Sequence, residues 1–385
     1  MFRLSRFMEA LVTGGEVPPR RAPPGPVVIW NVIRRCNLTC RHCYSLSNDT
    51  DFKGELSTEE ALAVLDQLKA ARVPAVIFSG GEPLLRPDLP VLLRRAKALG
   101  MHVSVSSNGT LLEAEMAATL ADCGVDYYGV SLDGLAPTHD VFRRLEGAFD
   151  AALRGVRLAR DSGIKTGIRM TLTEANADQL PAVVALMEAE GLDKFYLSHF
   201  NYAGRGRKHQ ADDAQHAATR RTLDWLFEHV YARAQAGQAG DFVTGNNDAD
   251  GVYLLNWIQH RAPGRVADMR QRLLNWGGNA TGVWVANIDN LGNVHPDTMW
   301  WQHTLGNVRQ RPFADIWADC SDPLMAGLKA RPRPLEGRCG RCPSREMCNG
   351  NTRVRAFATT GNAWAADPGC YLTDAEVGLL EEVPC

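Results

Sequence analysis

The chain has 385 residues, of which 45% are hydrophobic and 22% are charged, a composition typical of a globular protein with roughly two to three domains. Its net charge of −2 argues against a nucleic-acid binder held by overall charge. No apolar run reaches the roughly 18 residues that a membrane span needs, and no secretory signal segment is present, which predicts a cytoplasmic protein. Ten cysteines in such a protein favour metal or redox chemistry over disulfides.

Strands and helices are predicted to alternate through the first 200 residues. After a polar lead-in that includes a short helix, predicted strands cover 27–33, 75–78, 102–106, 127–132, 165–172 and 194–199. Predicted helices between them cover 58–71, 88–99, 111–122, 148–161 and 176–190. This alternation indicates βαβ units and a parallel sheet. Since ligands bind beyond the carboxyl ends of such strands, the loops there are expected to converge on one face.

The pattern changes after residue 200. Residues 201–216 are polar and loop-like, a helix is predicted at about 217–236, and a stretch rich in Gly, Asn and Asp follows at 241–251. A hairpin is predicted from 282, followed by short elements in which a metal cluster would replace a large core. The predicted organisation is therefore a lead-in at 1–24, an α/β domain at 25–240, a bridging segment at 241–281 and a C-terminal domain at 282–385.

Three cysteines follow the first predicted strand. Cys36, Cys40 and Cys43 have the spacing C-x3-C-x2-C. Three thiolates on one loop can hold three irons of a 4Fe–4S cluster and leave the fourth iron open, whereas electron-transfer clusters use four cysteines. A structural zinc site with a remote fourth ligand is the alternative. A second unusual loop, Gly80-Gly81-Glu82-Pro83, follows the next strand.

The order of these two motifs resembles the radical S-adenosylmethionine (SAM) superfamily. The resemblance implies a partial (β/α)6 barrel in which Cys36, Cys40 and Cys43 hold a 4Fe–4S cluster and SAM binds the open iron. It implies that one electron cleaves SAM into methionine and a 5′-deoxyadenosyl radical, which abstracts hydrogen from the substrate. It also implies an external electron donor of the flavodoxin or ferredoxin type.

The resemblance assigns SAM contacts to residues that follow the strands. They are His42 for the adenine, Gly80, Gly81 and Glu82 for the methionine amino group, Ser107, Asn108, Ser131 and Asp133 for the ribose and carboxylate, and Arg143 for the carboxylate. Glycines let the backbone approach a ligand, and arginine suits a carboxylate. Ordinary caps, turns and solvated side chains are the alternatives at these secondary positions.

A second group of cysteines lies near the C-terminus, at Cys339, Cys342, Cys348 and Cys370. Four thiolates can complete an auxiliary 4Fe–4S cluster or bind zinc. The resemblance to SPASM/twitch extensions of the superfamily favours the cluster.

Other positions fix how many clusters are expected. A full SPASM domain has two more cysteines around a hairpin, where this chain has Asn287 and Asp297, so we expect one auxiliary cluster and two clusters in all. Cys123 is expected in the core and Cys320 on a helix, and Cys385 has no assigned role.

The whole chain resembles the radical SAM enzymes of heme d1 biosynthesis, including the segments PPGPVVIWNVIRRCNLTCRHCYS and HPDTMWWQHTLGNVRQRPFADIW. This implies an iron tetrapyrrole substrate, 12,18-didecarboxysiroheme, which loses the propionates of two pyrrole rings while the auxiliary cluster receives an electron. Candidate carboxylate partners are Arg205, Arg207 and Lys208. Candidate aromatic contacts or iron ligands are Trp284, Trp300, Trp301, His199, His209, His295 and His303.

Three alternatives stay open. The nearest is a sister heme-biosynthesis enzyme that removes acetates or decarboxylates propionates. A SPASM peptide maturase is the second, although the roughly 24-residue lead-in is short for a peptide-recognition domain. A non-catalytic cluster or zinc scaffold is the third, and the three-cysteine loop argues against it.

Overall fold

One sheet of ten strands runs through the computed structural model, which describes residues 1–18, 22–238 and 240–379. Its strand order is β10-β9-β8-β1-β2-β3-β4-β5-β6-β7. The strands are β1 (Val27–Asn31), β2 (Ala75–Ser79), β3 (His102–Ser107), β4 (Tyr127–Ser131), β5 (Thr166–Leu172), β6 (Lys194–His199), β7 (Asp241–Gly245), β8 (Val285–Ile288), β9 (Asn293–His295) and β10 (Gly306–Asn307). Strands β1–β7 are parallel, and β8 is parallel to β1.

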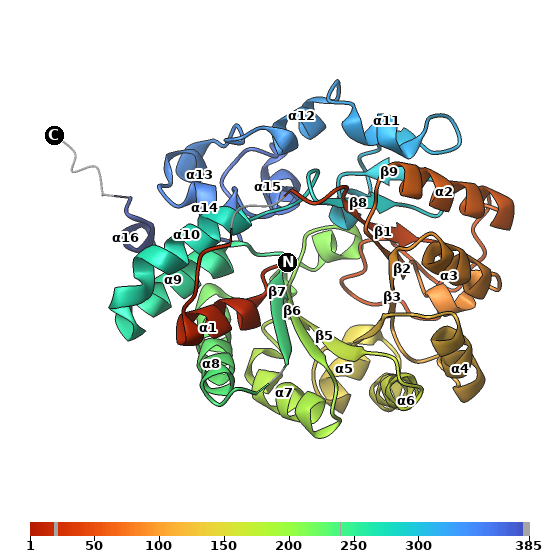
Figure 1. Cartoon of the computed structure of the whole chain (residues 1–385), viewed down its shortest axis with the longest axis horizontal. Coiled ribbons are helices and arrows are strands. Elements are labelled where there is room, and N and C mark those ends of the chain that lie inside the picture. Colours follow the sequence, from red (N-terminus) through yellow and green to blue (C-terminus); the bar gives the residue numbers. More distant parts are fainter. Residues whose placement is uncertain (19–21, 239, 380–385) are drawn as a thin grey trace.

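The helices follow the strands in alternation and then cluster at the C-terminus. They are α1 (Leu4–Thr13), α2 (Thr58–Ala70), α3 (Leu89–Ala98), α4 (Ala114–Asp122), α5 (Ala136–Arg143), α6 (Ala148–Asp161), α7 (Leu180–Ala189), α8 (His216–Gln235), α9 (Ala249–Arg261), α10 (Val266–Trp276), α11 (Phe313–Ala318), α12 (Pro323–Lys329), α13 (Gly337–Arg341), α14 (Arg345–Cys348), α15 (Arg353–Thr360) and α16 (Asp374–Val377). Figure 1 shows α2–α7 outside the curved sheet.

The partial (β/α)6 barrel predicted from the sequence is confirmed. Each of the six predicted strands is present, and the predicted cap starts α2, where the Glu60 amide donates to Ser57 Oγ at 3.2 Å and the Ser57 amide donates to Glu60 Oε2 at 2.8 Å. Such a reciprocal pair satisfies two amides that would otherwise lack a partner at a helix start. The outward-facing strand residues, such as Phe78 and Val105, are fully buried under the helices.

The sequence prediction misses β7. No strand was predicted in the stretch rich in Gly, Asn and Asp at 241–251, but Asp241–Gly245 pairs with β6 and extends the barrel by one strand. Phe242 and Val243 are buried in this strand, and burial of these two side chains outweighs the turn-forming residues around them. The helix α5, just before Arg144, also lies outside the predicted set of helices.

The predicted hairpin is present, but it belongs to the barrel sheet. Strand β8 pairs with β1 in the register Val27 to Val285, and β9 and β10 extend the sheet antiparallel beyond it. The C-terminal helices α11–α15, blue in Figure 1, lie along one side of the barrel. No helix within the described ranges is long and apolar enough to cross a membrane.

Candidate functional site

The three cysteines of the first motif lie together on the loop that follows β1. Cys36 and Cys40 are buried around Leu38, and Cys43 packs against them. Each sulfur has a polar neighbour. Asn108 Nδ2 lies 3.9 Å from Cys36 Sγ, Arg143 Nη1 lies 3.5 Å from Cys40 Sγ, and Ser45 Oγ lies 3.3 Å from Cys43 Sγ.

Burial raises the pKa of Cys36 to about 12, and the nearby Glu82 acts in the same direction. A bound metal reverses this preference because it deprotonates a coordinating thiol. The loop therefore offers three grouped sulfurs with polar support, which fits a cluster held by three cysteines.

Backbone hydrogen bonds join the Gly80-Gly81-Glu82 loop to the residues just before Cys36. The Gly81 amide donates to Ile33 O at 2.7 Å, and the Glu82 amide donates to Arg35 O at 2.9 Å. A Cβ atom at position 81 would lie 2.1 Å from Arg35 O, so only glycine allows this approach. The two loops are thus fixed to each other through their backbones.

Glu82 is fully buried and connects this loop to the end of β3. Its carboxylate accepts from Ser107 Oγ and from the Asn108 amide, each at 2.8 Å, and from the Leu84 amide at 3.2 Å. Burial raises the pKa of Glu82 to about 7 despite these donors. Glu82, Ser107 and Asn108 are therefore brought together next to Cys36, and their SAM contacts stay predictions.

Asp133 and Arg143 form a buried ion pair beside the cysteine loop. Arg143 Nε donates to Asp133 Oδ2 at 2.7 Å, and the Thr171 amide donates to Asp133 Oδ1 at 2.7 Å. Burial alone would raise the pKa of Asp133, but the Arg143 guanidinium holds it below its usual value. Arg143 therefore links Asp133 to Cys40, and the SAM contacts that the family resemblance implies for Asp133 and Arg143 stay predictions.

His42 stacks on Phe142, with ring centroids 4.5 Å apart and an interplanar angle of 12°. Burial lowers the pKa of His42 to about 3, and the charges of nearby arginines act in the same direction, so this imidazole is neutral. Ser131, at the end of β4, is half-buried. The adenine contact of His42 and the ribose contact of Ser131 stay predictions.

Arg205 has partners that the sequence did not predict. It belongs to the 3-10 helix Gly204–Lys208 after β6, where its Nε donates to Cys40 O at 2.7 Å and its Nη1 donates to Ser47 O at 2.8 Å. The remaining Nη2 is buried without a hydrogen-bond partner in the described part of the chain. Arg205 thus supports the cysteine loop, while Arg207 and Lys208 are exposed.

A second arginine, Arg169 on β5, points to the inner side of the barrel. Ile168 and Met170, its neighbours along the strand, are fully buried under the helices, and Arg169 faces the other way and is half-buried. Its Nη2 donates to Ser106 Oγ at 2.6 Å, and its guanidinium lies 5.9 Å from the Tyr196 ring centroid. No carboxylate lies within ion-pair distance of Arg169 among the described residues.

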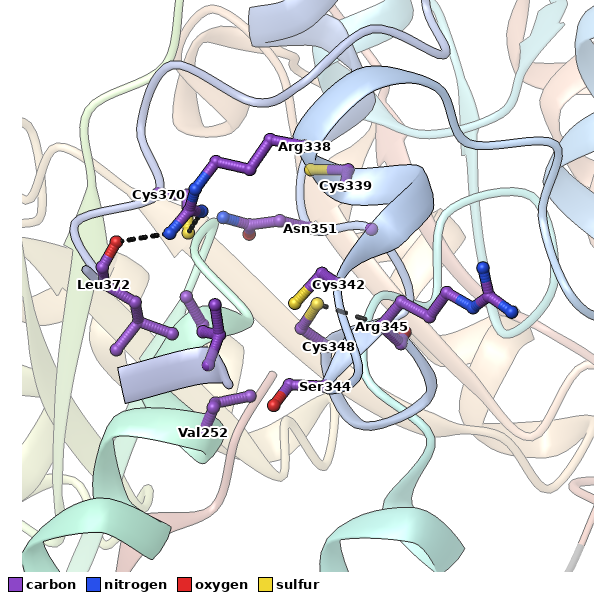
Figure 2. A pocket seen from close by; sticks show the side chains of 13 residues that line it. Val252, Arg338, Cys339, Cys342, Ser344, Arg345, Cys348, Asn351, Cys370 and Leu372 are labelled. Carbon is purple, nitrogen blue, oxygen red and sulfur yellow. Dashed lines mark hydrogen bonds between the residues drawn. The ribbon is translucent and has the colours of Figure 1, made fainter. Parts of the chain in front are cut away.

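The four C-terminal cysteines surround one cavity. Figure 2 shows Cys339, Cys342 and Cys348 on α13, α14 and the turn between them, with Cys370 arriving from a separate segment. Arg338 also lines the cavity, and its Nη1 lies 3.2 Å from Cys370 Sγ. Among the described residues, no three His, Cys, Asp or Glu side chains are grouped closely enough to hold a single metal ion. The four cysteines are linked instead by the one cavity that they all line.

Asparagine side chains connect this cavity to the barrel. The Asp248 amide donates to Asn351 Oδ1 at 2.6 Å, and Asn351 Nδ2 donates to Asn247 Oδ1 at 2.6 Å. Asn247 and Asp248 follow β7, so the second cysteine site is attached to the same end of the sheet as the first.

The remaining candidates have structural partners. Trp300 is buried in the C-terminal core, and Trp284 and Trp301 are half-buried. The four candidate histidines each have a protein neighbour: Asp250 for His199, Asp212 for His209, His303 O for His295 and Asp322 for His303.

The positions outside the two cysteine groups also have ordinary surroundings. Asn287 donates to Ile29 O at 2.7 Å, and Asp297 Oδ1 accepts from the Met299 amide at 2.8 Å. Cys123 is buried, as predicted. Cys320 is exposed and lies beyond the end of α11, so its predicted place on a helix is wrong. Cys385 lies outside the described residues.

Comparison with known proteins decides the family. The family model for the radical SAM superfamily matches residues 30–187. The chain is 50% identical to pre-heme d1 synthase of Dinoroseobacter shibae over 100% of this chain and 95% of that protein. The chain belongs to the radical SAM superfamily. Membership implies SAM and a 4Fe–4S cluster.

Two further comparisons extend this result. This radical SAM chain is 44% identical to Fe-coproporphyrin III synthase of Methanosarcina barkeri, over 92% of this chain and 90% of that protein. SuiB of Streptococcus suis, solved with its precursor peptide SuiA, has a TM-score of 0.71 at 18% identity over 91% of this chain and 76% of that chain, a likeness of fold.

The sequence did not predict that Arg169 and Arg338 lie at the two candidate sites of this radical SAM enzyme. Arg169 carried a signal, because a charged residue inside the buried run Thr166–Leu172 must face a polar space or a ligand. No sequence signal pointed to Arg338, because its partner Cys370 lies 32 positions further along the chain.

Proposed function

We propose that this chain is a radical SAM enzyme of heme d1 biosynthesis that removes propionate side chains from 12,18-didecarboxysiroheme. The observation that carries this proposal is the 50% identity to pre-heme d1 synthase over the whole chain. The grouped cysteines after β1 and the buried support around them fit a radical SAM site.

Cys36, Cys40 and Cys43 would hold the catalytic cluster, with SAM completing it. When bound, these groups supply a 5′-deoxyadenosyl radical for hydrogen abstraction from a propionate. The chain's own residues orient the site, because Glu82 fixes the turn Ser107–Asn108 at 2.8 Å and the buried Arg143 contacts Cys40.

Two arginines are candidate partners for the carboxylates of the substrate. Arg169 faces the inner side of the barrel with no carboxylate partner among the described residues, and the buried Nη2 of Arg205 has no hydrogen-bond partner there. Arginine binds carboxylates in bidentate geometry, which suits Arg169. Arg205 could offer only Nη2, because its Nε and Nη1 donate to the cysteine loop. Arg207 and Lys208, which are exposed, would attract the substrate's carboxylates at the entrance of the site.

The second cysteine site would hold an auxiliary 4Fe–4S cluster that accepts the electron leaving the substrate. Four cysteines around one cavity supply the four thiolates that such a cluster needs. An external donor of the flavodoxin or ferredoxin type would supply the electron that cleaves SAM. The nine described cysteines form no disulfide, so a reducing, cytoplasmic location would suit them.

A second candidate function is the removal of acetates, as in a sister heme-biosynthesis enzyme. The 44% identity to Fe-coproporphyrin III synthase over 92% of this chain favours it as the alternative. Both candidates use the same substrate class, so the inner arginines do not separate them.

The test is an anaerobic incubation of the reconstituted protein with 12,18-didecarboxysiroheme, SAM and a reductant, followed by product mass and 5′-deoxyadenosine analysis. Loss of propionate side chains with matching 5′-deoxyadenosine supports the proposal. Loss of acetates supports the second candidate. An unchanged tetrapyrrole, with SAM cleaved in the same sample, refutes both.

A further inference from the structure

Arg338 lies in hydrogen-bond contact with a sulfur of the second cysteine site. Figure 2 shows its guanidinium directed at Cys370, with Nη1 3.2 Å from the sulfur. The same guanidinium donates through Nη2 to Leu372 O and through Nε to Asp374 Oδ1, each at 2.6 Å. Three contacts in different directions hold the group in one orientation.

The cavity has an unusual charge pattern. Its lining includes Arg338 and Arg345 and contains no aspartate or glutamate among the described residues. Arg345 faces the other way, because its Nη1 donates to Gly340 O. Arg338 is therefore the cation that reaches a sulfur, and its side chain is only 27% exposed, so solvent screens its charge incompletely.

We propose that Arg338 raises the reduction potential of the auxiliary cluster through its charge and its N–H contact with Cys370. Reduction adds one negative charge to a cluster that already has four thiolate ligands. A cation and an N–H donor at a ligand sulfur stabilise the more negative state, and hydrogen bonds to sulfur are an established control of cluster potential. A higher potential makes it more favourable for the cluster to accept an electron. This inference rests on the proposed auxiliary cluster.

The experiment is a redox titration of the full chain holding both clusters, followed by EPR of the reduced auxiliary cluster. Arg338→Met removes the charge and the donor, and Arg338→Gln removes the charge and keeps a donor. We expect Arg338→Met to weaken electron affinity at least tenfold, equal to 59 mV for one electron, and Arg338→Gln to lie between it and the unmodified chain. The SAM cluster in the same sample is the internal reference.

Two further variants separate tuning from simple support. Arg345→Met removes a cation that lines the same cavity without reaching a sulfur, and it should leave the potential unchanged. Asp374→Asn breaks the same Arg338–Asp374 ion pair but removes a negative charge, so it should not lower the potential. A purely structural Arg338 would make Arg338→Met and Asp374→Asn shift the potential in the same direction.

The outcomes are distinct. An unchanged potential in Arg338→Met or Arg338→Gln protein that still holds the auxiliary cluster overturns the inference. If Arg338→Met loses the cluster, Arg338→Gln decides the matter alone, and equal potentials overturn the inference. About four irons and one zinc in the unmodified chain would instead refute the auxiliary cluster itself.

Discussion

Replacing Arg205 by Ala should loosen the loop that holds the catalytic cluster. Arg205 donates to Cys40 O at 2.7 Å and to Ser47 O at 2.8 Å, on the two sides of Cys43. A hydrogen bond to a charged group contributes about 1.5–3 kcal/mol to stability. We use the lower value because Arg205 is half-buried. The two bonds then stabilise the ordered loop by about 3 kcal/mol. Since 1.4 kcal/mol is a factor of ten, the ordered loop would become roughly 100-fold less favoured.

The assay is iron content and 5′-deoxyadenosine formation after anaerobic reconstitution, without tetrapyrrole. Arg205→Ala should lose iron from the first site and cleave little SAM, while Arg207→Ala, changed at an exposed neighbouring position, should retain that iron. Full iron content and normal SAM cleavage in Arg205→Ala, combined with weaker tetrapyrrole binding, would refute this reasoning and restore Arg205 as a pure substrate contact.

Three other predictions use the same preparations. Cys40→Ala should abolish 5′-deoxyadenosine formation and leave the auxiliary cluster's iron and EPR signal in place, so SAM cleavage at the normal rate would contradict the first site. The reconstituted chain should contain about eight irons, and about twelve would mean that a further cluster binds near Asn287 and Asp297. Arg169→Met should weaken tetrapyrrole binding, followed by the Soret band, by about 1.5–3 kcal/mol for one lost charged hydrogen bond. An unchanged dissociation constant would exclude Arg169 as a carboxylate partner.

Features that depend on the spacing of residues along the chain could be predicted from the sequence. Contacts between segments that are distant in the sequence could not. The strand and helix alternation and the cysteine groups are local patterns, so the barrel and the two candidate sites could be expected. Strand β7 was missed because its buried residues Phe242 and Val243 stand among turn-forming residues, and only pairing with β6 makes the strand favourable. The partners of Arg205 and Arg338 could not be predicted, because each contacts a loop distant in sequence.

The pairing of β8 with β1 also determines how this protein can be divided. The C-terminal part begins with β8, whose backbone partners are the residues of β1, starting at Val27. The other strands of the barrel, β2–β7, lie between these two strands in the sequence. A fragment starting at 282 would leave that strand edge without its partner and would expose apolar residues such as Ala286 and Ile288, which are now fully buried. The second cysteine site is thus not a transferable module. Its place relative to the first depends on the β1–β8 pairing and on the Asn351 bonds to the residues after β7. Exchange of C-terminal regions between related enzymes should therefore preserve function only when these partner segments are exchanged with them.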